Sequence, residues 1–151
     1  MKLLVTGGLG FVGSNFILKL LTESSDYEII NVDAELFGAD HKNLSEIKNS
    51  KKYHFEKGNI TNKKFMEEQI ANCDAVINFA AETFVDRSIN DANPFLVSNI
   101  RGAYTILDII TEQKKRMIQI STDEVFGSLE NGTADEQSKL NPSSPYAATK
   151  A

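Results

Sequence analysis

Short apolar runs alternate with segments of helical periodicity along most of the chain. The apolar runs predict strands at Lys2–Gly7, Tyr27–Asp33, Asp74–Ala81 and Arg116–Ser121, with a weaker one at Lys51–Gly58. Apolar residues at helical spacing predict helices over Phe11–Leu21, Asn62–Ala71 and Pro94–Glu112. This alternation predicts an α/β fold with a doubly wound parallel sheet, of the Rossmann-like kind. Such a sheet binds its ligands at the carboxyl ends of the strands.

The last segment predicts the start of a further helix. Ser144 is a candidate N-cap, and Pro145 suits the first helical position. Because a domain rarely ends within a first helical turn, we expect residues 1–151 to be the front part of a longer protein. On this expectation, the domain is incomplete and its final strands follow Ala151.

The composition is that of a globular domain, with 41% hydrophobic and 25% charged residues in a chain of 151. A net charge of -5 argues against a nucleic-acid or anionic-membrane surface.

The single cysteine, Cys73, rules out an intrachain disulfide and favours a reduced compartment. No apolar run approaches the roughly 20 residues of a membrane helix, and the N-terminus enters a strand without a signal-peptide pattern. We therefore expect a cytoplasmic protein. No His/Cys cluster suggests a metal.

The stretch TGGLGFVG follows the first strand and opens the first helix. Gly7, Gly10 and Gly13 are evenly spaced, and Gly8, Gly10 and Gly13 satisfy the G-x-G-x-x-G pattern. Such glycines let backbone N–H groups approach a pyrophosphate at a helix N-terminus. The alternative is a glycine turn without a ligand.

Asp33 ends the second strand, about 20 residues after the glycine loop. A carboxylate there can accept hydrogen bonds from the adenosine ribose and would repel a 2′-phosphate. The predicted cofactor is therefore NAD rather than NADP. The alternative is a solvated carboxylate at a strand end.

Tyr146 and Lys150 stand four positions apart, on one face of the final helix. A nearby ammonium lowers the pKa of a tyrosine, which can then act as a general base toward a sugar hydroxyl. Taken alone, this pair is common on helix surfaces, and its position after a dinucleotide loop and five strands favours the catalytic interpretation.

Taken together, these motifs resemble the extended short-chain dehydrogenase/reductase family and, within it, the dTDP-glucose 4,6-dehydratases. The resemblance spans nearly the whole chain and rests on TGGLGFVGSNF (Thr6–Phe16), NVD (Asn31–Asp33), VINFAAETFVDRSI (Val76–Ile89), STDEVFG (Ser121–Gly127) and PSSPYAATKA (Pro142–Ala151). The TDEVFG segment discriminates best, because epimerases of this superfamily usually lack its acidic pair.

The resemblance implies NAD-dependent conversion of dTDP-glucose to dTDP-4-keto-6-deoxyglucose. NAD takes a hydride from the 4-position and returns it to the 6-position after water is lost across the 5- and 6-positions. Tyr146 is the implied base on the 4-hydroxyl, Thr122 bonds the same oxygen, and Lys150 holds the nicotinamide ribose. Glu124 removes the 5-proton, and Asp123 protonates the departing 6-hydroxyl.

The acidic pair also suits this chemistry on physical grounds. Elimination needs one carboxylate that accepts a proton and one carboxylic acid that donates one, and repulsion between neighbouring carboxyls pushes their pKa values apart. The alternative for Asp123 and Glu124 is two solvated loop acids.

Further matching positions imply cofactor contacts at Phe11, Val12, Gly58, Asn59, Ile60, Phe79, Ala80, Ala81 and Thr83, with Thr83 also near the sugar. Asn99 matches a conformationally important helix asparagine of the family and is counted among the implied cofactor-binding residues. The chain departs from the family at four places. Asn59 replaces an aspartate, Thr83-Phe84 replaces Ser-His, Phe126 replaces a tyrosine, and the loop AELFGADHKNL (Ala34–Leu44) differs from the family's version.

The family's later portion supplies a smaller substrate domain, and its dimer interface uses the Tyr-Lys helix and the helix carrying Asn99. A homodimer is thus implied for the full-length protein, and an inactive fragment for residues 1–151 alone. Two alternatives stay open: another sugar-nucleotide dehydratase or a 4-epimerase acting on a UDP-sugar, and a non-catalytic NAD-binding module.

Overall fold

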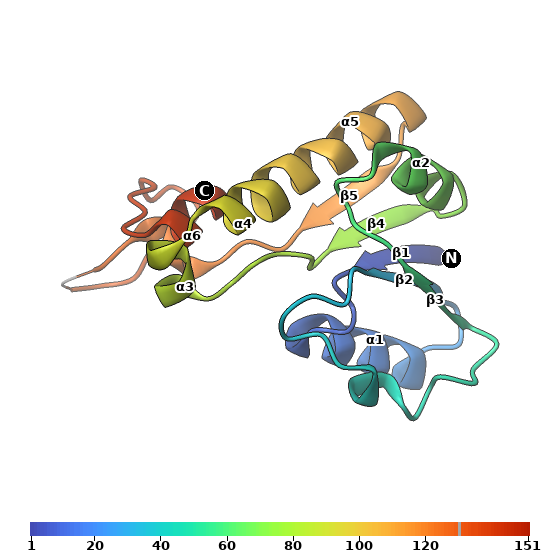
Figure 1. The fold of residues 1–151 in the computed structure, drawn as a ribbon. Helices are drawn as coiled ribbons and strands as arrows, with labels where there is room; N and C mark the ends of the chain where they lie inside the picture. Colours follow the sequence, from blue (N-terminus) through green and yellow to red (C-terminus); the bar gives the residue numbers. More distant parts are fainter. Residues whose placement is uncertain (130) are drawn as a thin grey trace.

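The computed structural model describes residues 1–129 and 131–151 and contains a five-stranded parallel sheet (Figure 1). The strands are β1 (Lys2–Thr6), β2 (Glu28–Asp33), β3 (Tyr53–Lys57), β4 (Ala75–Asn78) and β5 (Arg116–Gln119), in the order β3-β2-β1-β4-β5. All four neighbouring pairs are parallel. The predicted doubly wound α/β fold is confirmed. β2 ends at its predicted limit, Asp33, and the other four strands end one to three residues before theirs.

Helices cover both faces of this sheet (Figure 1). On one face lie α1 (Phe11–Glu23) and the short 3₁₀ helix η1 (His41–Leu44), and on the other lie α2 (Lys63–Ala71) and α5 (Ala103–Gln113). Each face has its own core, because a strand buried on both sides sends alternate apolar residues to opposite layers. One core centres on Leu4, Val32, Val76, Ile106 and Ile109, and the other on Val5, Ile17, Ile29, Leu44 and Ile77.

Cys73 belongs to the first of these cores. Its thiol donates to the Ile70 carbonyl at 3.3 Å, and burial raises the pKa of this thiol. Its role in the fold is therefore packing.

The long helix predicted over Pro94–Glu112 consists of three parts. It begins as α4 (Asn93–Phe95), continues as a π-helical segment η2 (Leu96–Gly102) and ends as α5. A π segment shifts the following side chains around the helix axis and often occurs at functional sites. The buried Asn99 lies within this π segment. Apolar periodicity predicts a helix here but does not distinguish a π segment from an α-helix.

Three short helices were not predicted from the sequence: η1, α3 (Val85–Asn90) and η3 (Asp123–Phe126). The acidic pair accordingly does not lie in a loop, as one interpretation of the sequence had it, but opens the 3₁₀ helix η3. Thr122 caps this helix, because its hydroxyl accepts a hydrogen bond from the backbone N–H of Glu124 at 3.3 Å.

The carboxyl ends of the strands face α3 and the final helix α6 (Pro145–Lys150) (Figure 1). β1 is flanked by β2 on one side and β4 on the other, so the chain reverses direction across the sheet at β1. This is the switch point at which ligands of such sheets bind. Among the described residues, no helix has the length and apolar character needed to cross a membrane.

Candidate functional site

A cleft of about 510 Å³ opens at the carboxyl ends of the strands, a size typical of small-molecule and cofactor sites. It collects most of the residues predicted to bind a dinucleotide: Gly7, Gly10, Phe11, Val12, Gly13, Asp33, Gly58, Asn59, Ile60, Phe79, Ala80, Ala81, Thr83, Tyr146 and Lys150. The lining also includes Glu82, within the predicted stretch 79–83, and residues that were not predicted as cofactor contacts: Val32, Ala34, Leu36, Phe37, Gly38, Ala39, Phe84, Ser98, Ile120 and Ser121. Most of these lie in connections whose path depends on the tertiary fold.

The glycines of the loop between β1 and α1 are required for different structural reasons. Gly7 has φ +71°, and a Cβ there would lie 2.5 Å from the backbone nitrogen of Ala80. A Cβ on Gly13 would lie 2.5 Å from the Gly7 carbonyl oxygen, so both positions require glycine for the close approach of strand and helix. A Cβ on Gly10 would meet only that same carbonyl, at 3.4 Å. Since Gly10 lines the cleft, its missing side chain leaves room for a ligand.

The N-terminus of α1 faces this cleft through Phe11 and Val12, which are exposed. Its N-cap, Gly10, provides no side-chain hydrogen bond, whereas Asn62 caps α2 and Ser144 caps α6. A helix N-terminus carries free N–H groups and a partial positive charge, which together suit an anion. The residues present therefore fit the pyrophosphate of a dinucleotide.

Asp33 is buried, and both of its carboxylate oxygens accept backbone hydrogen bonds. One bond comes from Leu9 N at 3.0 Å and the other from Glu35 N at 2.8 Å. Asp33 thus ties the glycine loop to the segment after β2. A carboxylate has about four acceptor positions, so each oxygen can still accept a ligand hydroxyl.

Asn59, where the family usually has aspartate, uses its side-chain oxygen in a local turn. This oxygen accepts from Thr61 N at 2.9 Å and from Thr61 Oγ1 at 2.8 Å. An aspartate would supply the same acceptor, so the departure preserves the turn that holds this part of the cleft.

Tyr146 is positioned by contacts from α3 and α4 and by the N-cap of its own helix. Its backbone N–H donates to Ser88 Oγ of α3 at 3.0 Å, and Ser144 Oγ accepts from Ala147 N at 3.0 Å. The buried ring of Tyr146 packs edge-on against Phe95, with centroids 6.2 Å apart. A side-chain cap from another helix therefore fixes the first turn of α6, which the sequence spacing alone could not show.

Lys150 also points into the site, and its ammonium donates to the Ile120 carbonyl at 2.6 Å. Burial lowers the pKa of Lys150. The same carbonyl accepts from Gln119 Nε2 at 3.3 Å, and Gln119 Oε1 accepts from Asn78 Nδ2 at 2.7 Å. Asn78 in turn bonds Thr6 at the end of β1. A chain of hydrogen bonds thus connects the end of β1, where the glycine loop begins, to Lys150.

Asn99, predicted as a cofactor residue, directs its amide to protein groups. Its oxygen accepts from Glu82 N at 2.8 Å, and its nitrogen donates to Glu82 O at 2.9 Å and to Thr149 Oγ1 at 2.9 Å. It is buried and is not among the residues that line the cleft. Asn99 thus locks the segment after β4 to α6, and a direct contact with a cofactor stays a prediction.

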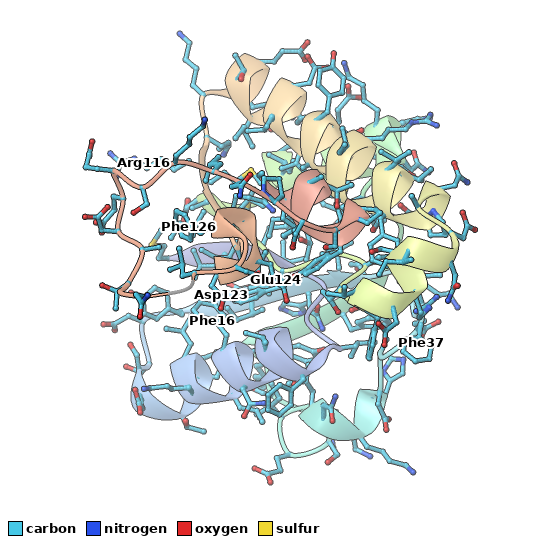
Figure 2. The ribbon with its side chains drawn as sticks, turned by 90° about the vertical axis from the view of Figure 1, so that its left-hand side faces the viewer. Phe16, Phe37, Arg116, Asp123, Glu124 and Phe126 are labelled. Atoms are coloured by element: carbon cyan, nitrogen blue, oxygen red, sulfur yellow. The ribbon has the colours of Figure 1, made fainter. Side chains whose placement is uncertain are left out.

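Thr122, Asp123 and Glu124 lie next to the cleft rather than in its lining, which on this segment ends at Ser121. Ser121 Oγ donates to the Lys150 carbonyl at 3.0 Å and so anchors the segment to α6. Figure 2 looks onto the carboxyl edge of the sheet and shows both acids on η3. Asp123 is exposed and Glu124 is half-buried, so the two carboxyls have different environments. The Thr122 hydroxyl also donates to Asp123 Oδ1 at 3.3 Å.

No cluster of His, Cys, Asp or Glu suited to a metal ion occurs among residues 1–129 and 131–151.

Comparison with known proteins identifies relatives of the whole chain. A family model described as GDP-mannose 4,6 dehydratase matches residues 4–151. The chain is 41% identical to the low-salt glycan biosynthesis protein Agl12 of Haloferax volcanii, covering 100% of this chain and 49% of that protein. It is 40% identical to a dTDP-glucose 4,6-dehydratase of Mycolicibacterium smegmatis, covering 100% of this chain and 46% of the relative.

A solved structure agrees with these sequence matches. DesIV, a dTDP-glucose 4,6-dehydratase of Streptomyces venezuelae crystallised with NAD, superposes with a TM-score of 0.95 at 38% identity, over 99% of this chain and 48% of DesIV. The chain spans about half the length of the curated relatives it matches. The resemblance predicted from the sequence motifs is confirmed.

Proposed function

This chain belongs to the GDP-mannose 4,6 dehydratase family, and from that membership we propose that the protein is an NAD-dependent dehydratase of a nucleotide-linked hexose. The proposed reaction converts dTDP-glucose to dTDP-4-keto-6-deoxyglucose, as the names of its dehydratase relatives suggest. Residues 1–151 would form part of its NAD-binding domain. One observation carries the proposal: a single cleft has the uncapped glycine-loop helix in one wall and Tyr146 with Lys150 in another.

The lining of the cleft supports an assignment of the residues that would hold NAD. The first-turn amides of α1 would bind the pyrophosphate, and Asp33 the adenosine ribose. Asn59 and Ile60 border the place for adenine, and Tyr146 and Lys150 that for the nicotinamide ribose. When bound, NAD supplies a hydride acceptor that becomes a hydride donor later in the same turnover.

Tyr146 would take the proton from the sugar's 4-hydroxyl. Lys150 lies one helical turn after Tyr146 on the same short helix, α6. Lys150 is held by its bond to the Ile120 carbonyl.

Glu124 and Asp123 would then remove water. The ketone at the 4-position acidifies the 5-proton, Glu124 accepts that proton, and Asp123 donates one to the leaving 6-hydroxyl. The proton from Asp123 and the 6-hydroxyl leave as water, and the proton from the 5-position stays on Glu124. Their different exposure supports giving the two neighbours different roles.

The test is turnover of the purified natural-length protein with dTDP-glucose, UDP-glucose and GDP-mannose. We expect a 4-keto-6-deoxy product, formed fastest from dTDP-glucose. A simple 4-epimer would instead assign the protein to the epimerases, and NAD binding without turnover would favour a non-catalytic module. A preference for GDP-mannose would keep the dehydratase chemistry and change the substrate.

We also propose that the protein forms a homodimer through the outer face of η2 and α5. Side chains there are large, apolar and between 39% and 64% exposed: Leu96, Val97, Ile100, Tyr104 and Leu107. Their helical spacing makes one continuous stripe, and contiguous exposed apolar patches mark interaction surfaces.

Replacing Ile100 with Glu is expected to weaken the dimer by about 30-fold or more, because a carboxylate would be buried without a partner. Sedimentation velocity over a range of protein concentrations measures this. Thr22→Glu on the exposed surface of α1 is the matched control. A monomeric parent protein, or an equally dimeric Ile100→Glu variant, would contradict the proposal.

Location in a reduced compartment such as the cytoplasm, favoured by the single buried thiol of Cys73, stays a prediction. Fractionation of the cells that produce the protein would test it.

A further inference from the structure

Two exposed phenylalanines meet across the rim of the cleft. Phe37 comes from the segment after β2 and Phe84 from the segment after β4, and both line the cleft. Their ring centroids are 5.1 Å apart and their planes meet at 83°, an edge-to-face pair. Such a geometry is favourable beyond the area it buries, so this contact links two walls of the cleft that no backbone ladder connects.

The position of this pair follows from the order of the strands. β2 and β4 flank β1 on opposite sides, so the segments that follow them can meet only by crossing over the carboxyl end of β1. The glycine loop begins at that end. The Phe37–Phe84 contact therefore spans the switch point at which the dinucleotide would lie.

Charged groups fix this contact from the α3 side. The Arg87 guanidinium carbon lies 4.4 Å from the centre of the Phe37 ring, a cation–π geometry. Figure 2 shows Phe37 at this edge of the molecule, beside α3. Arg87 also pairs with the Glu82 carboxylate at 3.2 Å, and that side chain is only 12% exposed.

The backbone of Glu82 is in turn held by Asn99 at 2.8 and 2.9 Å. The wall that carries Phe84 is therefore anchored to the helix before α5. The wall that carries Phe37 lies between two residues with positive φ, the non-glycine Glu35 at 55° and Gly38 at 86°. Gly38 has no neighbouring atom within 4 Å of an added Cβ, so there is open space beside the Phe37 segment.

The solvent exposure of Phe37 and Phe84 shows that packing in the hydrophobic core does not hold their rings in position. Phe37 is 66% and Phe84 52% exposed, although burial of a phenylalanine is strongly favourable. We propose that Phe37 and Phe84 form a gate over the dinucleotide cleft, whose contact must break each time a cofactor enters or leaves. This inference rests on the proposed function, since it takes NAD as the ligand.

The gate makes a kinetic prediction that a simple binding contact does not. In Phe37→Ala and Phe84→Ala, both the association and the dissociation rates of dinucleotide are expected to rise, each by about 3- to 10-fold, because the pair contact no longer opposes opening. The double variant should resemble the single ones, since either change alone removes the contact. The equilibrium affinity should change less than either rate.

The experiment uses the purified natural-length protein, stripped of cofactor, with fluorescent etheno-NAD as the probe. Stopped-flow mixing gives the association rate, and a chase with excess NAD gives the dissociation rate. Ile89→Ala, which removes an exposed apolar side chain of α3 outside the cleft, is the matched control. Thermal unfolding of each variant should match that of the parent, since both rings lie at the surface.

Unchanged rates in both single variants would overturn the gate. A rise confined to the dissociation rate would also overturn it, because the two rings would then act only as contacts to bound cofactor. A parent protein that binds no etheno-NAD would overturn the proposed function and the gate together. Binding with unaltered rates would overturn the gate alone, so the two failures are distinguishable.

Discussion

Replacing Tyr146 with Phe is expected to lower turnover of dTDP-glucose by about 10²- to 10⁴-fold, the usual contribution of a positioned general base. The change removes one hydroxyl and leaves the ring, which packs against Phe95 in the parent protein. It also leaves the backbone bond from residue 146 to Ser88. The loss should therefore appear in the rate of the first step, measured as reduction of bound cofactor after rapid mixing with substrate.

Tyr27→Phe is the matched control for this experiment. Tyr27 immediately precedes β2 and lies at the amino edge of the sheet, opposite the cleft, so the same loss of a hydroxyl should leave the rate unchanged. If Tyr146→Phe reduces bound cofactor as fast as the parent protein, Tyr146 is not the base on the 4-hydroxyl.

The second large effect is expected for Glu124→Gln, again about 10²- to 10⁴-fold in overall turnover. An amide of the same shape cannot accept the 5-proton, although the backbone N–H at this position can still bond Thr122. Reduction of bound cofactor should survive, and exchange of the 5-proton with deuterated solvent should be lost. Mass spectrometry of the recovered sugar nucleotide measures that exchange.

Asp123→Asn separates the two carboxyls. It should slow loss of the 6-hydroxyl while the 5-proton still exchanges, because Glu124 is intact. Glu112→Gln, an exposed change at the far end of α5, should alter neither step. Normal turnover by Glu124→Gln, or loss of exchange in Asp123→Asn alone, would contradict the proposed division of roles.

Much of the site could be predicted because its residues stand in local patterns. The glycine loop, Asp33 and the Tyr146–Lys150 spacing are each defined by neighbours in the chain, and the parallel sheet brings the ends of their elements together. The Phe37–Phe84 contact could not be predicted in this way, because 47 positions separate the two residues and only the order of the strands makes them neighbours.

The contacts of Asn99 also could not be predicted from local sequence patterns. Its helix was predicted, but its bonds to Glu82 and Thr149 depend on where the segment after β4 and α6 lie. Ser88 likewise became a positioning residue for Tyr146 only through the packing of α3 against α6. A hydrogen bond across the fold leaves no periodic signal in either segment.

The sequence by itself determined which segments are strands and helices, that the strands run parallel, and which local motifs stand at their carboxyl ends, because these depend on the alternation of apolar and polar residues and on short-range spacing. The tertiary structure alone decided how far each motif lies from the others. It placed the acidic pair on η3 beside the cleft rather than in its lining, and it joined two walls of that cleft through a pair of exposed rings. The physical reason is that such distances result from packing between elements remote in the chain, which no local pattern encodes.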